Sequence, residues 1–288
     1  MISHEMMGNI GYHSEVNKSA HQQIGGQSVL KRNQYRREGP DYRCGEQVSF
    51  HDIKEVFGLN HIRLGSWVEE EEKHKAANLI FDAFADLAFM LQLPPKAMGL
   101  RQTLNLAFGT GGQMGVQAHY MPAQRELALA KNAGAGALAH EFWHAFDHYI
   151  ATKAFDIPKT GIAFASHCWL ADHTPRVHPL NDRLMQLFAS VLLTDDGQDS
   201  HEYVRRAVAL DRQQGRQYFS KPTEMMARAF EACIEVHPEI QNPYLVNETL
   251  DSSLAKAGGY PTHEHREAIY RQLLAYFGPL GDALGREG

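Results

Sequence analysis

Apolar residues recur every three or four positions along much of the chain, and this spacing predicts helices. The clearest case is residues 67–93, where an acidic first turn precedes an apolar stripe that ends before Pro94 and Pro95. The same spacing predicts further helices at residues 49–58, 133–150, 180–193, 199–214, 222–237 and 263–277. The second half of the chain is therefore expected to be mostly helical, apart from an irregular stretch at residues 167–179.

Three short stretches between these helices carry an extended pattern instead. They are residues 103–108, 116–121 and 125–130, and they are separated by the Gly-rich residues 109–115 and by Pro122. We interpret them as neighbouring strands of a small mixed sheet that comes directly before the helix predicted at 133–150. This order predicts an α+β fold in which the sheet packs on that helix.

The composition divides the chain into three parts. Residues 1–46 are rich in Gly, Gln, Asn, Ser and Arg, which predicts a flexible arm; residues 47–277 form one domain, and residues 278–288 form a tail. The arm contains a basic cluster that could contact nucleic acid, made of Lys31, Arg32, Arg36, Arg37 and Arg43. However, the formal net charge of -6 gives the chain as a whole no attraction toward nucleic acid or an anionic membrane. A solvated arm is the favoured interpretation.

The sequence also indicates a cellular setting. No apolar run approaches the roughly 18 residues that span a bilayer, and the N-terminus lacks the features of a signal peptide. Cys44, Cys168 and Cys233 lie far apart without a CxxC pair, so neither a disulfide framework nor a thiolate metal cage is predicted. We expect a cytoplasmic protein without a membrane partner.

The helix predicted at 133–150 carries the main chemical motif, His140-Glu141-Phe142-Trp143-His144. Residues four apart lie on one face of a helix, so His140 and His144 can both bind one zinc ion. Glu141 lies beside that face, where it can act as general base toward a water molecule. Apolar residues occupy the opposite side of the helix, and small residues from Gly134 onward are expected in its first turns. The motif therefore predicts a catalytic zinc site that faces a cleft.

A catalytic zinc ion needs a third protein ligand. The local candidates are His148 and Asp147, and Asp147 is better placed to accept a ring N–H and to orient an imidazole. The best candidate further along is Glu224, in a helix that Pro222 begins, with Glu231 on the same face as an alternative ligand or supporting residue. Spacing alone equally favours an ordinary helix ion pair between Glu224 and Arg228. Tyr218, six residues before Glu224, could supply a phenol to an oxyanion, but a lone tyrosine is by itself a weak signal.

Several blocks of the sequence resemble, in the same order, the zincin-like metallopeptidase domain of the large polyvalent proteins of phages and conjugative elements. The blocks are Val56-Phe57-Gly58, Leu106-Ala107-Phe108-Gly109, Ala118-His119-Tyr120, Leu138-Ala139-His140-Glu141, Ala145-Phe146-Asp147, Tyr218-Phe219-Ser220 and Ala227-Arg228-Ala229-Phe230-Glu231. The two motif helices are also similar to those of the anthrax lethal factor catalytic domain. Both relatives have glycine directly before the second histidine, where this chain has Trp143.

The resemblance implies a zincin-like fold and a specific set of roles. His140, His144 and Glu224 would bind Zn²⁺, Glu141 would be the base, and Tyr218 would be the phenol that stabilises the transition state, although it is offset by one position from that of lethal factor. Residues 116–121 would be the edge strand that binds the substrate. We therefore expect a zinc metalloendopeptidase of a mobile element that acts on a protein or peptide. The alternative is a non-catalytic accessory module with a blocked site, which Trp143 favours.

Overall fold

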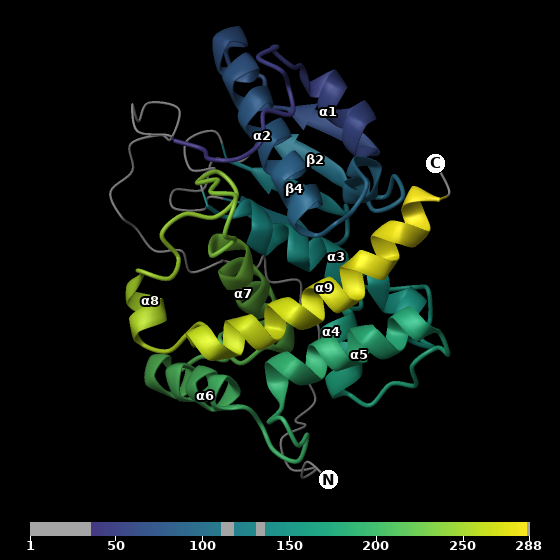
Figure 1. Ribbon diagram of the computed structural model, residues 1–288, viewed down its shortest axis with the longest axis vertical. Coiled ribbons are helices and arrows are strands. Elements are labelled where there is room, and N and C mark those ends of the chain that lie inside the picture. The colour runs from purple at the N-terminus through teal and green to yellow at the C-terminus, as the bar shows by residue number, and fades with distance from the viewer. Residues whose placement is uncertain (1–35, 111–117, 131–135, 287–288) are drawn as a thin grey trace.

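The computed structural model describes residues 36–110, 118–130 and 136–286. Figure 1 shows the sheet with α1 and α2 at one end of the molecule, α5 and α6 at the other, and the long helix α9 crossing between them. Together these elements confirm the predicted α+β fold with a small mixed sheet and a mostly helical second half.

The first part of the structure builds the sheet and the helices beside it. Its elements are α1 (Phe50–Phe57), β1 (His61–Leu64), α2 (Glu70–Met90), the 3-10 helix η3 (Pro95–Gly99), β2 (Asn105–Phe108), β3 (Ala118–Met121) and β4 (Glu126–Leu129). Local signals explain α1: Ser49 and Asp52 form a capping box, and Gly58 ends the helix with a φ of 63°. These signals are readable in the sequence, and the predicted helix at 49–58 is confirmed.

The sheet has the strand order β1-β2-β4-β3. β1, β2 and β4 run parallel, whereas β3 is antiparallel to β4, with Tyr120 opposite Leu127. The three predicted strands are therefore neighbours, as expected, and β3 lies at an edge. β1 was not predicted; it is only four residues long and alternates exposed with half-buried residues, so its apolar signal is weak.

The second part of the structure is helical. Its elements are α3 (Leu138–Ala154), α4 (Ala165–Leu170), α5 (Pro179–Leu192), α6 (Glu202–Gln214), α7 (Pro222–Glu235), α8 (Ser253–Lys256) and α9 (His263–Gly285). Two predictions need correction here. Part of the stretch expected to be irregular forms α4, and the last helix continues through Pro279 to Gly285 instead of ending at residue 277. Gly281 permits this continuation, because a Cβ there would lie 1.9 Å from the carbonyl oxygen of Gln92.

Helix α3 lies at the centre of the molecule and packs on β3, β4, α4 and α7. It begins at Leu138, so of the small residues expected in its first turns Ala139 lies in the helix, whereas Gly136 and Ala137 come before it; Gly134 and Ala135 lie outside the described residues. Gly136 has a φ of +89° and approaches the backbone of Asn247, where a Cβ would lie 2.8 Å from the amide nitrogen. The amide of Gly136 donates to the carbonyl of Tyr244, and that of Ala139 to the carbonyl of Leu245. The start of the motif helix is thus fixed by the segment that follows α7.

The end of the predicted arm is docked on α2. Arg37 donates to the fully buried carboxylate of Asp86, with Nε–Oδ2 at 2.7 Å, and Arg43 pairs with Asp82 at 2.9 Å. A backbone bridge joins Glu38 to Gln241. The charges of two residues of the basic cluster are therefore neutralised by α2. Lys31, Arg32 and the rest of residues 1–35 lie outside the described part of the chain.

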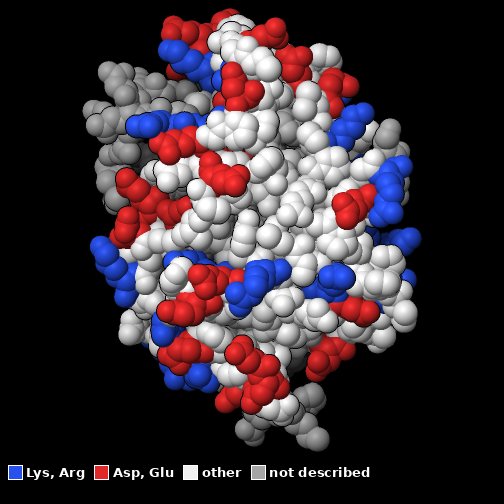
Figure 2. All heavy atoms as spheres, viewed as in Figure 1, with Lys and Arg blue, Asp and Glu red and all other residues white. Residues whose placement is uncertain are grey.

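The surface charges, the cysteines and the lengths of the helices can be compared with what the composition predicts. On the face shown in Figure 2, acidic and basic side chains are interspersed, and a broad uncharged band crosses the middle. All three cysteines are free thiols, two of them buried. Within the described ranges, no helix combines the length and apolar character needed to cross a bilayer.

Candidate metal centre

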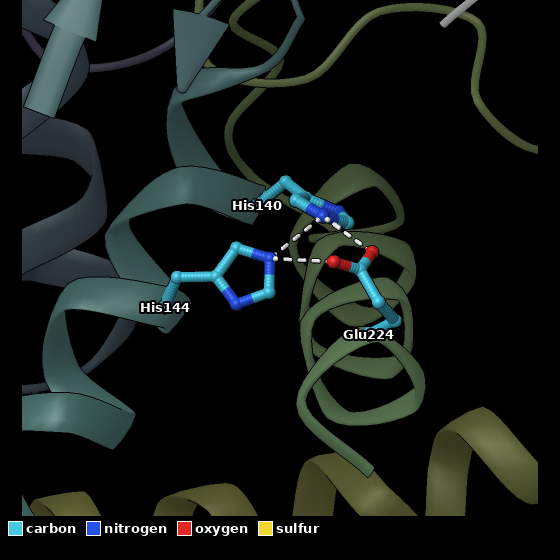
Figure 3. A group of neighbouring side chains, drawn as sticks. All are labelled: His140, His144 and Glu224. Atoms are coloured by element: carbon cyan, nitrogen blue, oxygen red, sulfur yellow. Dashed lines mark hydrogen bonds and ion pairs between the residues drawn. The ribbon is translucent and has the colours of Figure 1, made fainter. Parts of the chain in front are cut away.

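Three side chains from two helices converge inside the molecule (Figure 3). His140 and His144 project from α3 toward α7, and Glu224 points back from the first turn of α7. The two Nε2 atoms are 3.2 Å apart, and they lie 3.5 Å and 3.4 Å from the two carboxylate oxygens of Glu224. These three residues are the only group of metal-ligating side chains that the described ranges bring together. Two imidazoles and one carboxylate are a donor set that catalytic zinc sites use.

The three side chains are almost completely buried, with exposed fractions of 4% for His140, 5% for His144 and 1% for Glu224. This burial differs from the expected open cleft, because the polar side of α3 faces α7 instead of solvent. The carboxylate atom Glu224 Oε2 accepts no hydrogen bond from the described residues, and its only described polar contact is the 3.5 Å ion pair with His140 Nε2. A buried carboxylate oxygen is costly unless a partner compensates it. A cation between the two Nε2 atoms and this carboxylate would compensate it, so the residues fit a metal ion.

The charges around the histidines also suit a cation. Burial would lower the pKa of His140, but the neighbouring carboxylates of Glu224 and Glu231 outweigh that effect and raise the pKa to about 10. Burial would likewise raise the pKa of Glu224, but the neighbouring His144 and His140 hold it well below its usual range. The carboxylates therefore favour positive charge at the position where the ring nitrogens meet.

His140 is oriented by a chain of side chains from α7 and from the segment that follows it. Its Nδ1 lies 2.9 Å from Glu231 Oε2, and Glu231 is fully buried. The other carboxylate oxygen of Glu231 accepts a hydrogen bond from the hydroxyl of Thr249 at 2.8 Å. Glu235 accepts the backbone N–H of Thr249 at 2.7 Å and so fixes this threonine. The contact between Glu231 and Nδ1 fixes the orientation of the His140 ring, so that Nε2 faces the cluster.

Glu141 connects the motif helix to the edge of the sheet. Its Oε2 accepts the backbone N–H of Tyr120 in β3 at 2.7 Å. Burial raises the pKa of Glu141, an effect that the neighbouring His144 and His140 oppose. A glutamate with a raised pKa can take up a proton more readily than an ordinary one. The arrangement thus places a candidate base between the histidine pair and the edge strand.

Asp147 does not have the role that spacing suggested. Its two carboxylate oxygens accept the backbone N–H and the hydroxyl of Ser166, at 2.8 Å and 2.5 Å. Asp147 therefore fixes the start of α4 on α3, and Glu231 is the carboxylate that holds a histidine ring. The local alternative ligand, His148, lies outside the cluster, because its Nδ1 is 2.8 Å from the hydroxyl of Tyr120.

Tyr218 lies in the loop between α6 and α7, beside Glu224. Burial is the main reason why the pKa of its phenol is raised, and the neighbouring carboxylate of Glu224 raises this pKa further. The structure thus brings together the predicted residues His140, His144, Glu224, Glu141, Tyr218 and Glu231, and leaves Asp147 in a different role. Arg228 belongs to no described ion pair with Glu224; its guanidinium donates to the carbonyl of Phe219.

Trp143 points away from the ligands. Its ring is 1% exposed and lies 5.5 Å from the ring of Phe146 and 5.0 Å from that of Phe230, measured between centroids. The residue before the second histidine therefore fills the core between α3 and α7.

Sequence reasoning missed three supporting residues: Ser166, Thr249, and Arg228 as a loop anchor. Each makes its contact with a residue in another element or loop, for which the sequence carries no spacing signal.

Comparisons with known proteins connect one part of this site to a family. Residues 210–284, about a quarter of the chain, match the family model described as large polyvalent protein-associated domain 1. The matched segment contains Tyr218, Glu224 and Glu231, but not His140 or His144. Searches of curated proteins and of solved structures found no significant match. The match therefore links the chain, through its α7 half of the cluster, to large polyvalent proteins.

Proposed function

We propose that this protein is a zinc-dependent metallopeptidase with a gluzincin-type site, in which His140, His144 and Glu224 hold the metal. The observation that carries the proposal is the convergence of two motif histidines with a carboxylate from a different helix, 80 positions later in the chain. An ordinary helix surface would not bury these groups together, because buried ionisable side chains are costly without a partner. Zinc, when bound, polarises a carbonyl group and lowers the pKa of a water molecule.

The side chains around the cluster have the chemistry for peptide hydrolysis. Glu141 takes the proton of the attacking water and then delivers it to the leaving amine. Its carboxylate is held at one oxygen by Tyr120, which leaves Oε1 without a described hydrogen bond and available for that proton. Tyr218, beside Glu224, donates its phenol to the oxyanion that forms at the attacked carbonyl. Glu231 holds His140 in place during the reaction.

The substrate would lie along the edge strand β3. Backbone groups alternate in direction along a strand, and the N–H of Tyr120 points away from β4 toward Glu141. The backbone groups of Ala118 therefore face the same side as the Tyr120 N–H, and this is the side on which an extended peptide would pair with the strand. The N–H of Tyr120 positions Glu141, and the backbone groups of Ala118 would bind the substrate, so β3 would serve both the base and the peptide. A protein or peptide substrate in a phage or conjugative element fits the match to large polyvalent proteins.

Metal analysis of purified variants tests the first half of this proposal. We expect one zinc ion per chain in the wild type and in Glu141→Gln, and loss of zinc in Glu224→Ala. The exposed Glu264→Gln is the matched control and keeps its zinc. A wild type that binds no zinc at micromolar concentration, or a Glu224→Ala variant that binds it normally, would refute the assignment.

Cleavage of a peptide library tests the second half. The wild type should cut a subset of peptides, and Glu141→Gln should lose that activity while it retains zinc. Zinc binding without cleavage in the wild type would instead support the non-catalytic accessory module. The position of Trp143 in the core gives no support to a site blocked by its indole.

A further inference from the structure

On the α6 side, a single carboxylate holds the loop that carries Tyr218. Asp211, in the last turn of α6, is 6% exposed. Its Oδ1 accepts the backbone N–H groups of Tyr218 and Phe219 at 2.8 Å and 2.7 Å. Its Oδ2 accepts the N–H and the hydroxyl of Ser220 at 2.9 Å and 2.5 Å. Four donors from three consecutive residues thus converge on one side chain.

The same loop is held from the opposite side by α7. Arg228 is 2% exposed and donates to the carbonyl of Phe219, and its guanidinium lies 5.3 Å from the centre of the Phe219 ring. Arg228 comes one helical turn after Glu224 on α7. The backbone of Phe219 is therefore fixed at its N–H by α6 and at its carbonyl by α7. Few rotations of the 218–220 backbone remain between these two anchors.

This fixation decides where the Tyr218 phenol lies. Only two side-chain torsions separate the backbone of a tyrosine from its ring, so a fixed backbone confines the hydroxyl to a small region. The ring also packs on that of Phe219, with 5.2 Å between centroids, and lies below the guanidinium of Arg216 at 5.3 Å. These contacts confine the ring, and the phenol lies close enough to Glu224 for that carboxylate to raise its pKa.

We propose that Asp211 is a positioning residue of the metal site, which sets the Tyr218 phenol against Glu224 by holding the backbone of residues 218–220. The inference rests on the proposed function for its metal, but not on peptide cleavage. Asp211 itself touches neither substrate nor metal. Its effect is transmitted through Tyr218, so removing Asp211 has no further consequence at the site once the phenol is gone.

The change Asp211→Asn tests this idea with little alteration of shape. An asparagine oxygen can still accept from Tyr218 and Phe219, but its NH₂ group faces the two donors of Ser220. We expect zinc affinity, measured by competition with a chelating dye, to fall about tenfold in Tyr218→Phe, as is typical when a group that supports a ligand is removed. Asp211→Asn should cause a similar loss, and the double variant should bind zinc no more weakly than Tyr218→Phe alone.

Two further variants keep the test interpretable. Ser220→Ala removes one of the four donors and should give a smaller loss of zinc affinity, even if Asp211→Asn folds poorly. Asp251→Asn makes the same chemical change at an exposed residue and should have wild-type affinity. The proposal is overturned if Asp211→Asn binds zinc as the wild type does, or if its loss multiplies with that of Tyr218→Phe. Wild-type affinity in Tyr218→Phe would overturn it too.

Kinetics on a cleaved peptide separate this inference from the proposed activity. Asp211→Asn should lower kcat to the level of Tyr218→Phe with KM unchanged, whereas general damage to the fold would change both. A protein that shows the expected zinc affinities but cuts no peptide would refute the peptidase and leave the role of Asp211 intact. A peptidase whose Asp211→Asn variant retains the wild-type kcat would refute the role of Asp211 alone.

Discussion

Replacing Trp143 tests whether this residue supports the core or restricts the metal site. The change Trp143→Ala removes a ring that is 1% exposed and packs on Phe146 and Phe230. Truncation of a buried aromatic residue to alanine costs about 3–5 kcal/mol of unfolding free energy. An opposing effect comes from the indole Nε1, which is buried without a hydrogen-bond partner among the described residues. Removing such a group relieves a penalty of about 1–3 kcal/mol.

The packing loss is the larger of the two effects, so Trp143→Ala should lower the free energy of unfolding by about 2 kcal/mol. Trp143→Phe keeps an aromatic ring and removes the unpaired N–H, so it should be close to the wild type in stability. Urea denaturation of the metal-free proteins measures both values. Both variants should retain one zinc per chain. A Trp143→Ala variant of wild-type stability that gains zinc affinity or cleavage would show that the indole restricts the site.

Three further predictions follow from other buried groups. Glu231→Gln should weaken zinc binding about 10- to 100-fold in a chelator competition, because His140 loses its charged partner; unchanged affinity would contradict that role. Arg37→Ala should lower the unfolding free energy by about 3 kcal/mol, because it leaves the carboxylate of Asp86 buried with less compensation, and equal urea midpoints would refute this. Burial lowers the pKa of His265 to about 4 from its ordinary 6.5, so the unfolded chain binds the extra proton and stability falls as pH drops through this window, by at most about 3 kcal/mol. His265→Gln should flatten this fall in urea midpoints measured at about pH 7.5 and 5; the same slope as in the wild type would contradict it.

Elements with local signals could be predicted from the sequence. Helix α1 has a capping box and a terminal glycine, and α7 begins at Pro222. The elements that were not predicted depend on contacts with residues elsewhere in the chain. Helix α4 has six residues, and its Ser166 amide is held by Asp147 on another helix. Short elements of this kind are stabilised by tertiary contacts, which periodicity does not report.

The same distinction applies to the candidate site. The i, i+4 spacing of His140 and His144 follows from helix geometry alone, so the sequence could pair them. Spacing left Glu224 equally consistent with an ion pair to Arg228, and only the packing of α3 on α7 puts its carboxylate beside the histidines. Asp147 was assigned to an imidazole because it lies on the right face of α3. In the structure Asp147 instead accepts from Ser166, a contact that depends on how α4 packs on α3.

The segment that matches the polyvalent family, residues 210–284, builds only half of the cluster. It buries Glu224 and Glu231, and both carboxylates find their partners on His140 and His144 of α3. Without α3, both carboxylates would lose their histidine partners, and only Glu231 would keep a described hydrogen bond from within the segment, from Thr249, so burying the two charges would cost several kcal/mol. The matched segment therefore needs the motif helix to complete its interior, and the motif helix needs the segment for its third ligand. In the proposed zinc site, metal binding would for this reason be coupled to the packing of α3 on α7.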